Sequence, residues 1–195
     1  GGANPASWLR RQGSRGGSTV KGLVINNCQG NGITAGGSGG HTIQGNYIGI
    51  EPDGTTVNAN DSNGVHLGGP NNIVGGTGAG EGNVLSGNLG SGIAILSWQN
   101  TVRGNFIGTD AAGVTAKGNG FISGSSRNGA GILIQDGADD NTIGGNTASA
   151  RNVISGNKNS GVEITAITNS QNGNLIRGNY IGVAANGTSA LGNGL

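Results

Sequence analysis

The chain writes one fourteen-residue segment three times, and no other feature restricts its fold as strongly. The segment reads HTIQGNYIGIEPDG at residues 41–54, NTVRGNFIGTDAAG at 100–113 and NLIRGNYIGVAANG at 174–187. The asparagines, glycines and aliphatic residues recur, whereas the carboxylates change from copy to copy. Such repetition indicates a stacked architecture in which each unit packs mainly on its neighbours.

Three short strand-like motifs recur in a fixed order within these repeats. A GxxI type places an apolar residue at Ile33, Val65, Ile93, Ile132 and Val162. An NTIxG type does so at Val20, Ile43, Val74, Val102, Ile143 and Ile176, and a GNxI type at Ile25, Ile48, Leu85, Ile107, Ile154 and Ile181. The barest copy spans about 23 residues, so the pattern predicts one solenoid turn of three short strands per unit.

Alternation within the motifs predicts which side chains face inward, because successive strand residues point to opposite faces. The apolar columns face the lumen together with Leu67, Ile95, Ile134 and Ile164, whereas the second motif turns Lys21, Gln44, Arg103 and Arg177 outward. An asparagine follows the glycine of the third motif on five successive coils: Asn46, Asn83, Asn105, Asn152 and Asn179. Stacked about 4.8 Å apart, these amides predict an asparagine ladder.

The order NTIxGNxIG, GNVISGN, GVxI resembles the right-handed parallel β-helix repeats of bacterial secreted and cell-surface proteins in the pectate-lyase-like superfamily. The resemblance covers residues 18–195 and implies an all-β, single-stranded, right-handed parallel β-helix of about six coils. It also implies a secreted or cell-surface location. The motifs expected of pectin-acting members, a GHG or an NTD followed by DD and RIK, are absent as a set, so the resemblance implies no particular activity.

The two ends differ from the repeat. Residues 1–17 are expected to form a capping segment in which 4–13 make a short helix, with Asn4 as N-cap and Pro5 in the first turn. This helix would lay Trp8 and Leu9 over the first coil. At the other end SALGNGL stops where the next strand would begin, so we expect a fragment of a longer solenoid or end-to-end self-association through an uncapped last coil.

Composition excludes several function classes. The chain has 195 residues with 45 Gly, but its 10% of charged residues and net charge of +1 lack the charge excess of disordered chains. No basic run suggests nucleic acid as a partner, and the apolar runs are too short for membrane insertion. Cys28 has no second cysteine to pair with, and a small buried filler is its expected role.

Inserted loops expand the two corners that flank the third strand, on alternate coils. One corner carries 75–82 and 144–151, and the other carries 49–60, 108–130 and 182–193. The outward column of that strand reads Val24, Tyr47, Val84, Phe106, Val153 and Tyr180. Either the loops cover this column as a second small core, or it forms the floor of a groove where Tyr47, Phe106 and Tyr180 stack on sugar rings. A protein–protein interface is a third interpretation.

Carboxylates supply the candidate catalytic and metal sites. Loop alignment places Glu51 over Asp110, about 9.6 Å apart if coils stack at about 4.8 Å, close to the separation of roughly 6.5–9.5 Å in inverting glycosidases. Acids on glycine-rich turns are also ordinary turn formers. Asp136, Asp139 and Asp140 share a turn that could hold Ca²⁺, although the EF-hand spacing is missing and an Asx turn explains them too.

Trp98 is expected beside those three acids, as a sugar platform or packed under a loop. His41 and His66 show no partner for a metal or triad role. Three function classes follow: a non-catalytic scaffold or interaction surface, a polysaccharide-binding module, and a polysaccharide hydrolase or lyase. The scaffold is favoured over an enzyme because repetition explains most residues, and no metal or cofactor beyond the Ca²⁺ candidate is expected.

Overall fold

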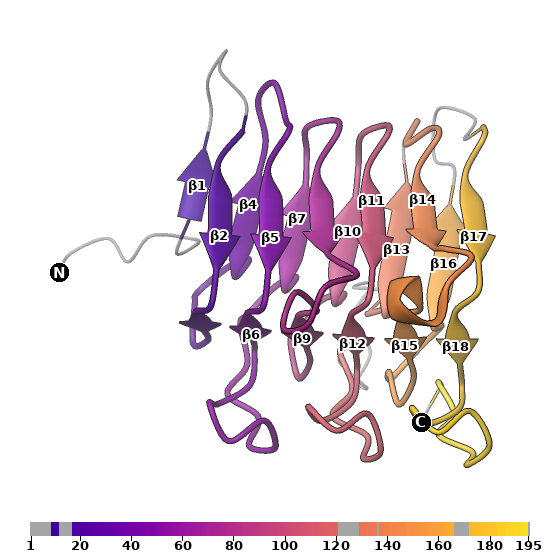
Figure 1. Cartoon of the computed structure of the whole chain (residues 1–195). Coiled ribbons are helices and arrows are strands. Elements are labelled where there is room, and N and C mark those ends of the chain that lie inside the picture. Colours follow the sequence, from indigo (N-terminus) through magenta and orange to yellow (C-terminus); the bar gives the residue numbers. More distant parts are fainter. Residues whose placement is uncertain (1–8, 12–16, 121–128, 136, 166–171, 195) are drawn as a thin grey trace, which may run out of the picture.

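A computed structural model describes residues 9–11, 17–120, 129–135, 137–165 and 172–194. The chain winds through three sheets in turn, and each sheet contains six parallel strands stacked along the molecule (Figure 1). Every third strand along the chain lies beside its predecessor in the same sheet. The protein is therefore the parallel β-helix that the repeat predicts.

Each sheet collects the strands of one motif. The first sheet contains β1 (Leu9–Arg11), β4 (Ile33–Ala35), β7 (Val65–Leu67), β10 (Ile93–Ile95), β13 (Ile132–Gln135) and β16 (Val162–Thr165). The second contains β2 (Thr19–Lys21), β5 (Thr42–Gln44), β8 (Ile73–Gly75), β11 (Thr101–Arg103), β14 (Thr142–Gly144) and β17 (Leu175–Arg177). The third contains β3 (Val24–Ile25), β6 (Tyr47–Ile48), β9 (Val84–Leu85), β12 (Phe106–Ile107), β15 (Val153–Ile154) and β18 (Tyr180–Ile181). We number the coils one to six, from β1–β3 to β16–β18.

The core is a column of aliphatic side chains inside the coil. Strand pairing puts equivalent motif positions side by side, as with Val102 beside Ile143 and Ile107 beside Leu85. The predicted inward positions of coils two to five are buried, which confirms the alternation. In the sixth coil Ile164, Ile176 and Ile181 are 49%, 36% and 46% exposed, because no coil among the described residues stacks on their outer side.

Asparagine ladders run along all three corners of the coil. The predicted ladder, at the corner between the second and third sheets, is confirmed by side-chain hydrogen bonds of 2.8–3.0 Å between successive rungs. A second ladder joins Asn72, Asn100, Asn141 and Asn174, and a third joins Asn60, Asn88, Asn119, Asn157 and Asn193. The interior rungs are buried, so each amide satisfies backbone groups that water cannot reach.

The first described residues correct one prediction. Leu9–Arg11, within the helix expected at 4–13, form strand β1 and pair in parallel with β4. This pairing satisfies the backbone N–H and C=O groups on the outer edge of β4. A helix at Leu9–Arg11 would leave those groups without a partner strand. Asn4, Pro5 and Trp8 lie outside the described residues. Within the described ranges the only helix is the 3-10 turn η1 (Ala148–Ala150), and none is long or apolar enough to cross a membrane.

Candidate functional site

Three equivalent loops project from the third sheet after β6, β12 and β18 (Figure 1). Each is a small hairpin closed by an antiparallel bridge: Ile50 with Val57, Thr109 with Ala116, and Val183 with Ala190. At the neck of the first loop, the N–H of Asn58 donates to the carbonyl of Gly49 at 3.0 Å. The chain then re-enters the third ladder at Asn60, as the other loops do at Asn119 and Asn193. The loops are therefore insertions that leave the coil unchanged.

The three loops also stack on one another, at intervals of two coils. The N–H of Ala111 donates to the carbonyl of Gly54 at 3.0 Å, and the N–H of Ala185 donates to the carbonyl of Gly113 at 2.8 Å. The equivalent residue of the first loop is Pro52, which has no N–H to donate. A second row of turns thus accompanies the solenoid, and Pro52 stands at its start.

The loops cover the aromatic side chains of the third sheet. Tyr47, Phe106 and Tyr180 are half-buried, and Val84 and Val153 between them are only 5% exposed. Gly113 has a φ of +71° and lies against the Phe106 ring, since a Cβ there would come within 2.6 Å of Phe106 Cε1. Gly54 lies over Tyr47 in the same way. This geometry fits the second-core interpretation of the column better than the open groove.

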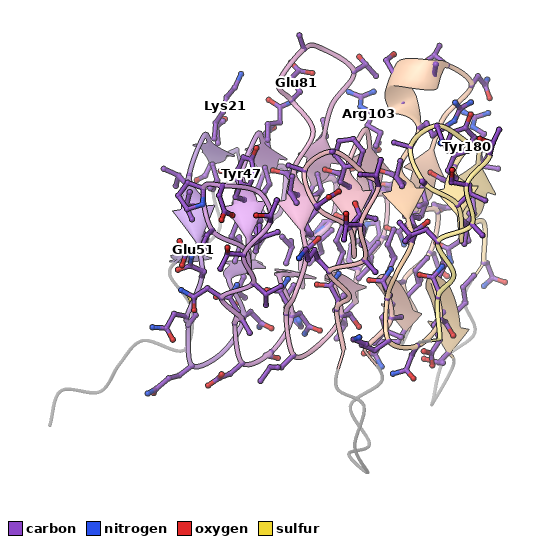
Figure 2. The ribbon with its side chains drawn as sticks, turned by 90° about the horizontal axis from the view of Figure 1, so that it is seen from below. Lys21, Tyr47, Glu51, Glu81, Arg103 and Tyr180 are labelled. Atoms are coloured by element: carbon purple, nitrogen blue, oxygen red, sulfur yellow. The ribbon has the colours of Figure 1, made fainter. Side chains whose placement is uncertain are left out.

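Tyr180 has a second covering group. The guanidinium carbon of Arg151 lies 4.0 Å from the centroid of the Tyr180 ring, a cation–π contact, and Arg151 Nε donates to the carbonyl of Gly178 at 3.0 Å. Figure 2 shows Tyr47 and Tyr180 at opposite ends of this face. The aromatic strip is therefore partly shielded, by loops and by Arg151.

One side chain in each loop binds the same pair of backbone amides. In the first loop Asp53 Oδ1 accepts from the N–H groups of Thr55 and Thr56, both at 2.8 Å. In the third loop Asn186 Oδ1 accepts from the equivalent Thr188 and Ser189, both at 3.0 Å. The second loop has Ala112 at that position.

Asp110 takes over this role in the second loop. Although it lies two residues earlier than Ala112, its Oδ1 accepts from the N–H groups of Val114 and Thr115 at 2.9 and 3.2 Å. These are the same two amides of the turn by loop alignment. The carboxylates that vary between the repeats are therefore alternative ways to satisfy one turn.

These hydrogen bonds keep both carboxylates ionised. Donation from the Thr56 hydroxyl and from the amides of Thr56 and Thr55 holds the pKa of Asp53 well below its usual range. Burial by itself would raise the pKa of Asp110, but donation from Val114 and Thr115 outweighs it, so the pKa lies below the ordinary value. Neither carboxyl group has the raised pKa typical of a general acid at neutral pH.

The predicted catalytic pair occupies equivalent positions on successive loops, but its members have different partners. Glu51 is half-buried and accepts a hydrogen bond from Asn58 Nδ2 at 2.7 Å, across the neck of its own loop. Asp110 is 6% exposed and faces the amides of its own turn. Both side chains thus stabilise their loops, and the geometry offers Asp110 little access to a substrate.

Trp98 and the acidic turn meet at another corner, between the first and second sheets. Trp98 is 51% exposed, and the N–H of the next residue, Gln99, donates to the carbonyl of Asp139 at 3.0 Å. This bond joins the turn that carries Trp98 to the turn that carries Asp139 on the following coil. Asp139 Oδ1 accepts from the N–H of Asn172 at 2.7 Å, and Asp140 has a left-handed φ of 54°. These are the features of a turn.

The Ca²⁺ candidate gains no support from these contacts. Asp136 lies outside the described residues, and the described residues contain no group of three or more His, Cys, Asp or Glu side chains placed to hold a metal. Asp139 Oδ1 binds a backbone amide of the following coil. A turn stabilised by the Asp139 side chain is sufficient to explain the contacts of this residue.

His41 and Cys28 bind neighbouring residues of the coil, and His66 is half-buried on its surface. His41 occupies the first rung of a ladder, where its N–H donates to Asn72 Oδ1 at 2.9 Å and its Nε2 lies 3.1 Å from the carbonyl of Gly36. His66 faces outward and half-buried, and burial lowers its pKa. Cys28 is 4% exposed, with its N–H donating to Asn60 Oδ1. Each of these side chains fits the coil.

The repeat predicts only that Arg103 faces outward from the second sheet. In the structure it lies between two projecting loops, since the N–H of the next residue, Gly104, donates to the carbonyl of Ala150 and a Cβ on Gly104 would meet Gly76. Figure 2 places Lys21, Glu81 and Arg103 along this edge. No described residue accepts a hydrogen bond from the Arg103 Nε atom, which is buried. In the sequence, only the placement of inserted loops on alternate coils indicates that Arg103 lies between two loops.

Comparison with known proteins adds no relative. No protein-family model, no curated protein and no solved structure matches the chain.

Proposed function

We propose that this chain is a non-catalytic β-helix scaffold of a secreted or cell-surface protein, which holds rows of loops at fixed spacing. The observation that carries the proposal is the use of the polar residues inside the repeat. Three asparagine ladders and one turn-binding side chain in each of the three loops bind groups of the fold itself, and Asp110 of the predicted catalytic pair is one of these turn-binding residues. A chain that commits its carboxylates to its own backbone supports a framework better than a reaction centre.

The second row of turns supports the same proposal. The loops after β6, β12 and β18 are joined by the Ala111–Gly54 and Ala185–Gly113 hydrogen bonds, so they form one surface at a two-coil period. Such a surface suits repeated contacts with another protein. The secreted or cell-surface location rests on the family resemblance of the repeat.

A second candidate function, polysaccharide binding, is favoured by one observation. Trp98 is 51% exposed, so one large aromatic side chain is available to a sugar ring without any rearrangement. Tyr47, Phe106 and Tyr180 offer less surface, because loops cover them. If the chain binds a glycan, we therefore propose Trp98 as the contact.

A glycan array combined with a reducing-sugar assay tests both candidates. The scaffold proposal expects no release of sugar from any polysaccharide and no binding in the micromolar range. Binding that Trp98→Ala abolishes, while Val114→Ala leaves it intact, would establish the glycan-binding alternative. Val114 is a matched control because it is also an exposed apolar residue, 53% accessible, on a different face. Release of sugar that Glu51→Gln or Asp110→Asn stops would overturn the non-catalytic proposal.

A further inference from the structure

Arg103 extends from the second sheet between two projecting loops (Figure 2). Its partner on β8 is Gly75, and Gly144 holds the equivalent position on β14. Both glycines have left-handed φ values, 84° and 93°, where the chain leaves the strand for the loops at 75–82 and 144–151. Arg103 therefore has a loop beside it on each neighbouring coil, in place of a strand side chain.

The guanidinium of Arg103 has no acceptor among the described residues. Its Nε atom is the one buried side-chain nitrogen or oxygen there that lacks a hydrogen-bond partner. The two Nη groups donate to no described residue either, and they are not buried. Glu81, the acid of the loop at 75–82, accepts from the N–H of Gly78 at 2.8 Å and forms no ion pair with Arg103. The charged group is thus covered at its inner atom and open at its two outer atoms.

The stability of the fold does not explain this arrangement. A charged N–H that neither water nor an acceptor reaches costs free energy, and an unbranched apolar side chain would fill the same space without that cost. Every other buried side-chain nitrogen or oxygen of the described residues has a partner, the ladder rungs included. A contact made by the two open Nη groups of Arg103 is the better explanation.

The surface around Arg103 is positively charged. Lys21 and Arg177 face outward from the same sheet and are exposed, and Arg151 belongs to the loop at 144–151. The six strands of this sheet contain no Asp or Glu. A carboxylate that approaches this sheet therefore meets a field of opposite sign, which favours its binding.

We propose that Arg103 binds a Glu or Asp side chain of a protein partner, whose carboxylate enters between the two loops and accepts from both Nη groups. One carboxylate satisfies two donors of a guanidinium at once. The loops exclude water from the pair, as the surrounding contacts do at an arginine hot spot of a protein interface. A carboxylate on a flexible stem reaches between loops, whereas a uronate carboxylate sits directly on its sugar ring. The inference rests on the scaffold function proposed above and names one contact of its partner.

A short poly-L-glutamate chain is the probe, because it presents carboxylates on the flexible stems of a polypeptide. Calorimetry at low salt should show binding to the unmodified protein, and Arg103→Met should weaken it by about tenfold or more, since two charge-assisted hydrogen bonds are lost. Arg177→Met removes the same charge from the same sheet and is the matched control, with an expected loss below about threefold. Equal losses would indicate diffuse attraction of a polyanion and would overturn the proposal, as would the absence of binding.

Two further probes decide the source of the anion. Polygalacturonate presents carboxylates on sugar rings, and inorganic sulfate is a free oxyanion. Both should bind more weakly than poly-L-glutamate, compared per anionic group. Tighter binding of either one that Arg103→Met abolishes would make a glycan or a small anion the ligand and would overturn the proposal.

Thermal unfolding of the same variants separates a binding role of Arg103 from a structural one. Arg103→Met keeps an apolar stem and removes the buried unpaired N–H, so the melting temperature should stay the same or rise. A fall of more than about 5 °C would show that the guanidinium holds the two loops together, and would overturn the proposal. None of these measurements depends on the release of sugar or on Trp98, so this inference and the proposed function fail separately.

Discussion

At the scale of single residues, three different side chains accept hydrogen bonds from equivalent backbone amides in the three loops of the third sheet. Each loop of the third sheet has two turn amides that need an acceptor, and Asp53, Asp110 and Asn186 supply it from two different sequence positions. A carboxylate and a carboxamide are equivalent in this role, because both present an oxygen to the N–H groups. The side chains that resemble an acid pair in the sequence are thus determined by local turn geometry.

Removal of the Asp110 acceptor should destabilise the protein. Asp110→Ala leaves the amides of Val114 and Thr115 without their side-chain acceptor, so we expect the free energy of unfolding to fall by about 1 kcal/mol. Asp110→Asn keeps an oxygen in place and should lose clearly less. Urea denaturation measures both variants, and equal losses would show that the acceptor is not the cause.

His66 should give the stability a pH dependence. Burial lowers its pKa from 6.5 in the folded protein, so between that value and the folded pKa the unfolded chain binds one more proton than the native chain. The contribution of His66 is therefore complete above pH 6.5 and is lost as the pH falls through the folded pKa. Chemical denaturation from pH 8 to pH 5 should show a drop that His66→Gln lacks, and an unchanged drop in His66→Gln would assign it to another group.

At the scale of elements, ladders and strands stabilise each other. The strands of the third sheet contain only two residues each, too few to fix a register by backbone pairing alone. From the second coil onward, an asparagine rung precedes each of these strands. Each rung bonds to the following coil, and Asn179 of the sixth coil bonds to the preceding one, so that corners and strands share the same spacing. Glycine-rich coils with few aromatic residues can thus be held in one register.

Replacement of an interior rung should cost more than replacement of any loop residue. Asn105→Ala removes a side chain that is 1% exposed, so the backbone N–H and one Nδ2 hydrogen of Asn83 lose their acceptor and the carbonyl of Val74 loses a donor. We expect a loss of about 3 kcal/mol or more in the free energy of unfolding. Asn58→Ala, which breaks only the bond to Glu51, is the control and should lose less than about 1 kcal/mol. Thermal and urea unfolding of both variants measure the difference.

At the scale of the whole molecule, the solenoid has two unlike ends. The first coil closes the ladders with Ser18, Leu23 and Cys28, whereas the sixth coil leaves Asn174, Asn179 and Asn193 with donors to spare. Since each coil contacts mainly its neighbours, stability is close to a sum of coil interfaces, and the first and sixth coils, which pair with one neighbour each, contribute least to it.

Local stability should therefore vary along the axis. We expect amides of β11 and β12 to exchange slowest and those of β17 and β18 to exchange at least about tenfold faster, because the sixth coil has only one neighbour. Hydrogen exchange with mass spectrometry measures this on the unmodified chain. A uniform protection pattern would mean that the solenoid opens as one cooperative unit, against the expectation.

The sequence by itself determined the coil, its register, the inward columns and one ladder, because each of these repeats at a fixed distance from the strand motif. The ladder at Asn60, Asn88, Asn119, Asn157 and Asn193 was not predicted, because loops of different length separate its rungs from the preceding strand of the third sheet. The strand at Leu9–Arg11 was missed as well, since local helix signals outweighed a pairing that only the neighbouring coil provides.

Only the tertiary structure decided what the variable residues do. Whether Phe106 meets solvent or a loop depends on where Gly113 folds, and whether Asp110 is a catalytic acid or a turn acceptor depends on amides four and five residues away in the chain. These contacts are set by the path of each inserted loop, which no repeat encodes. Periodicity specifies the framework because identical coils must stack alike, while the surface is specified by the irregular segments that the stack holds in place.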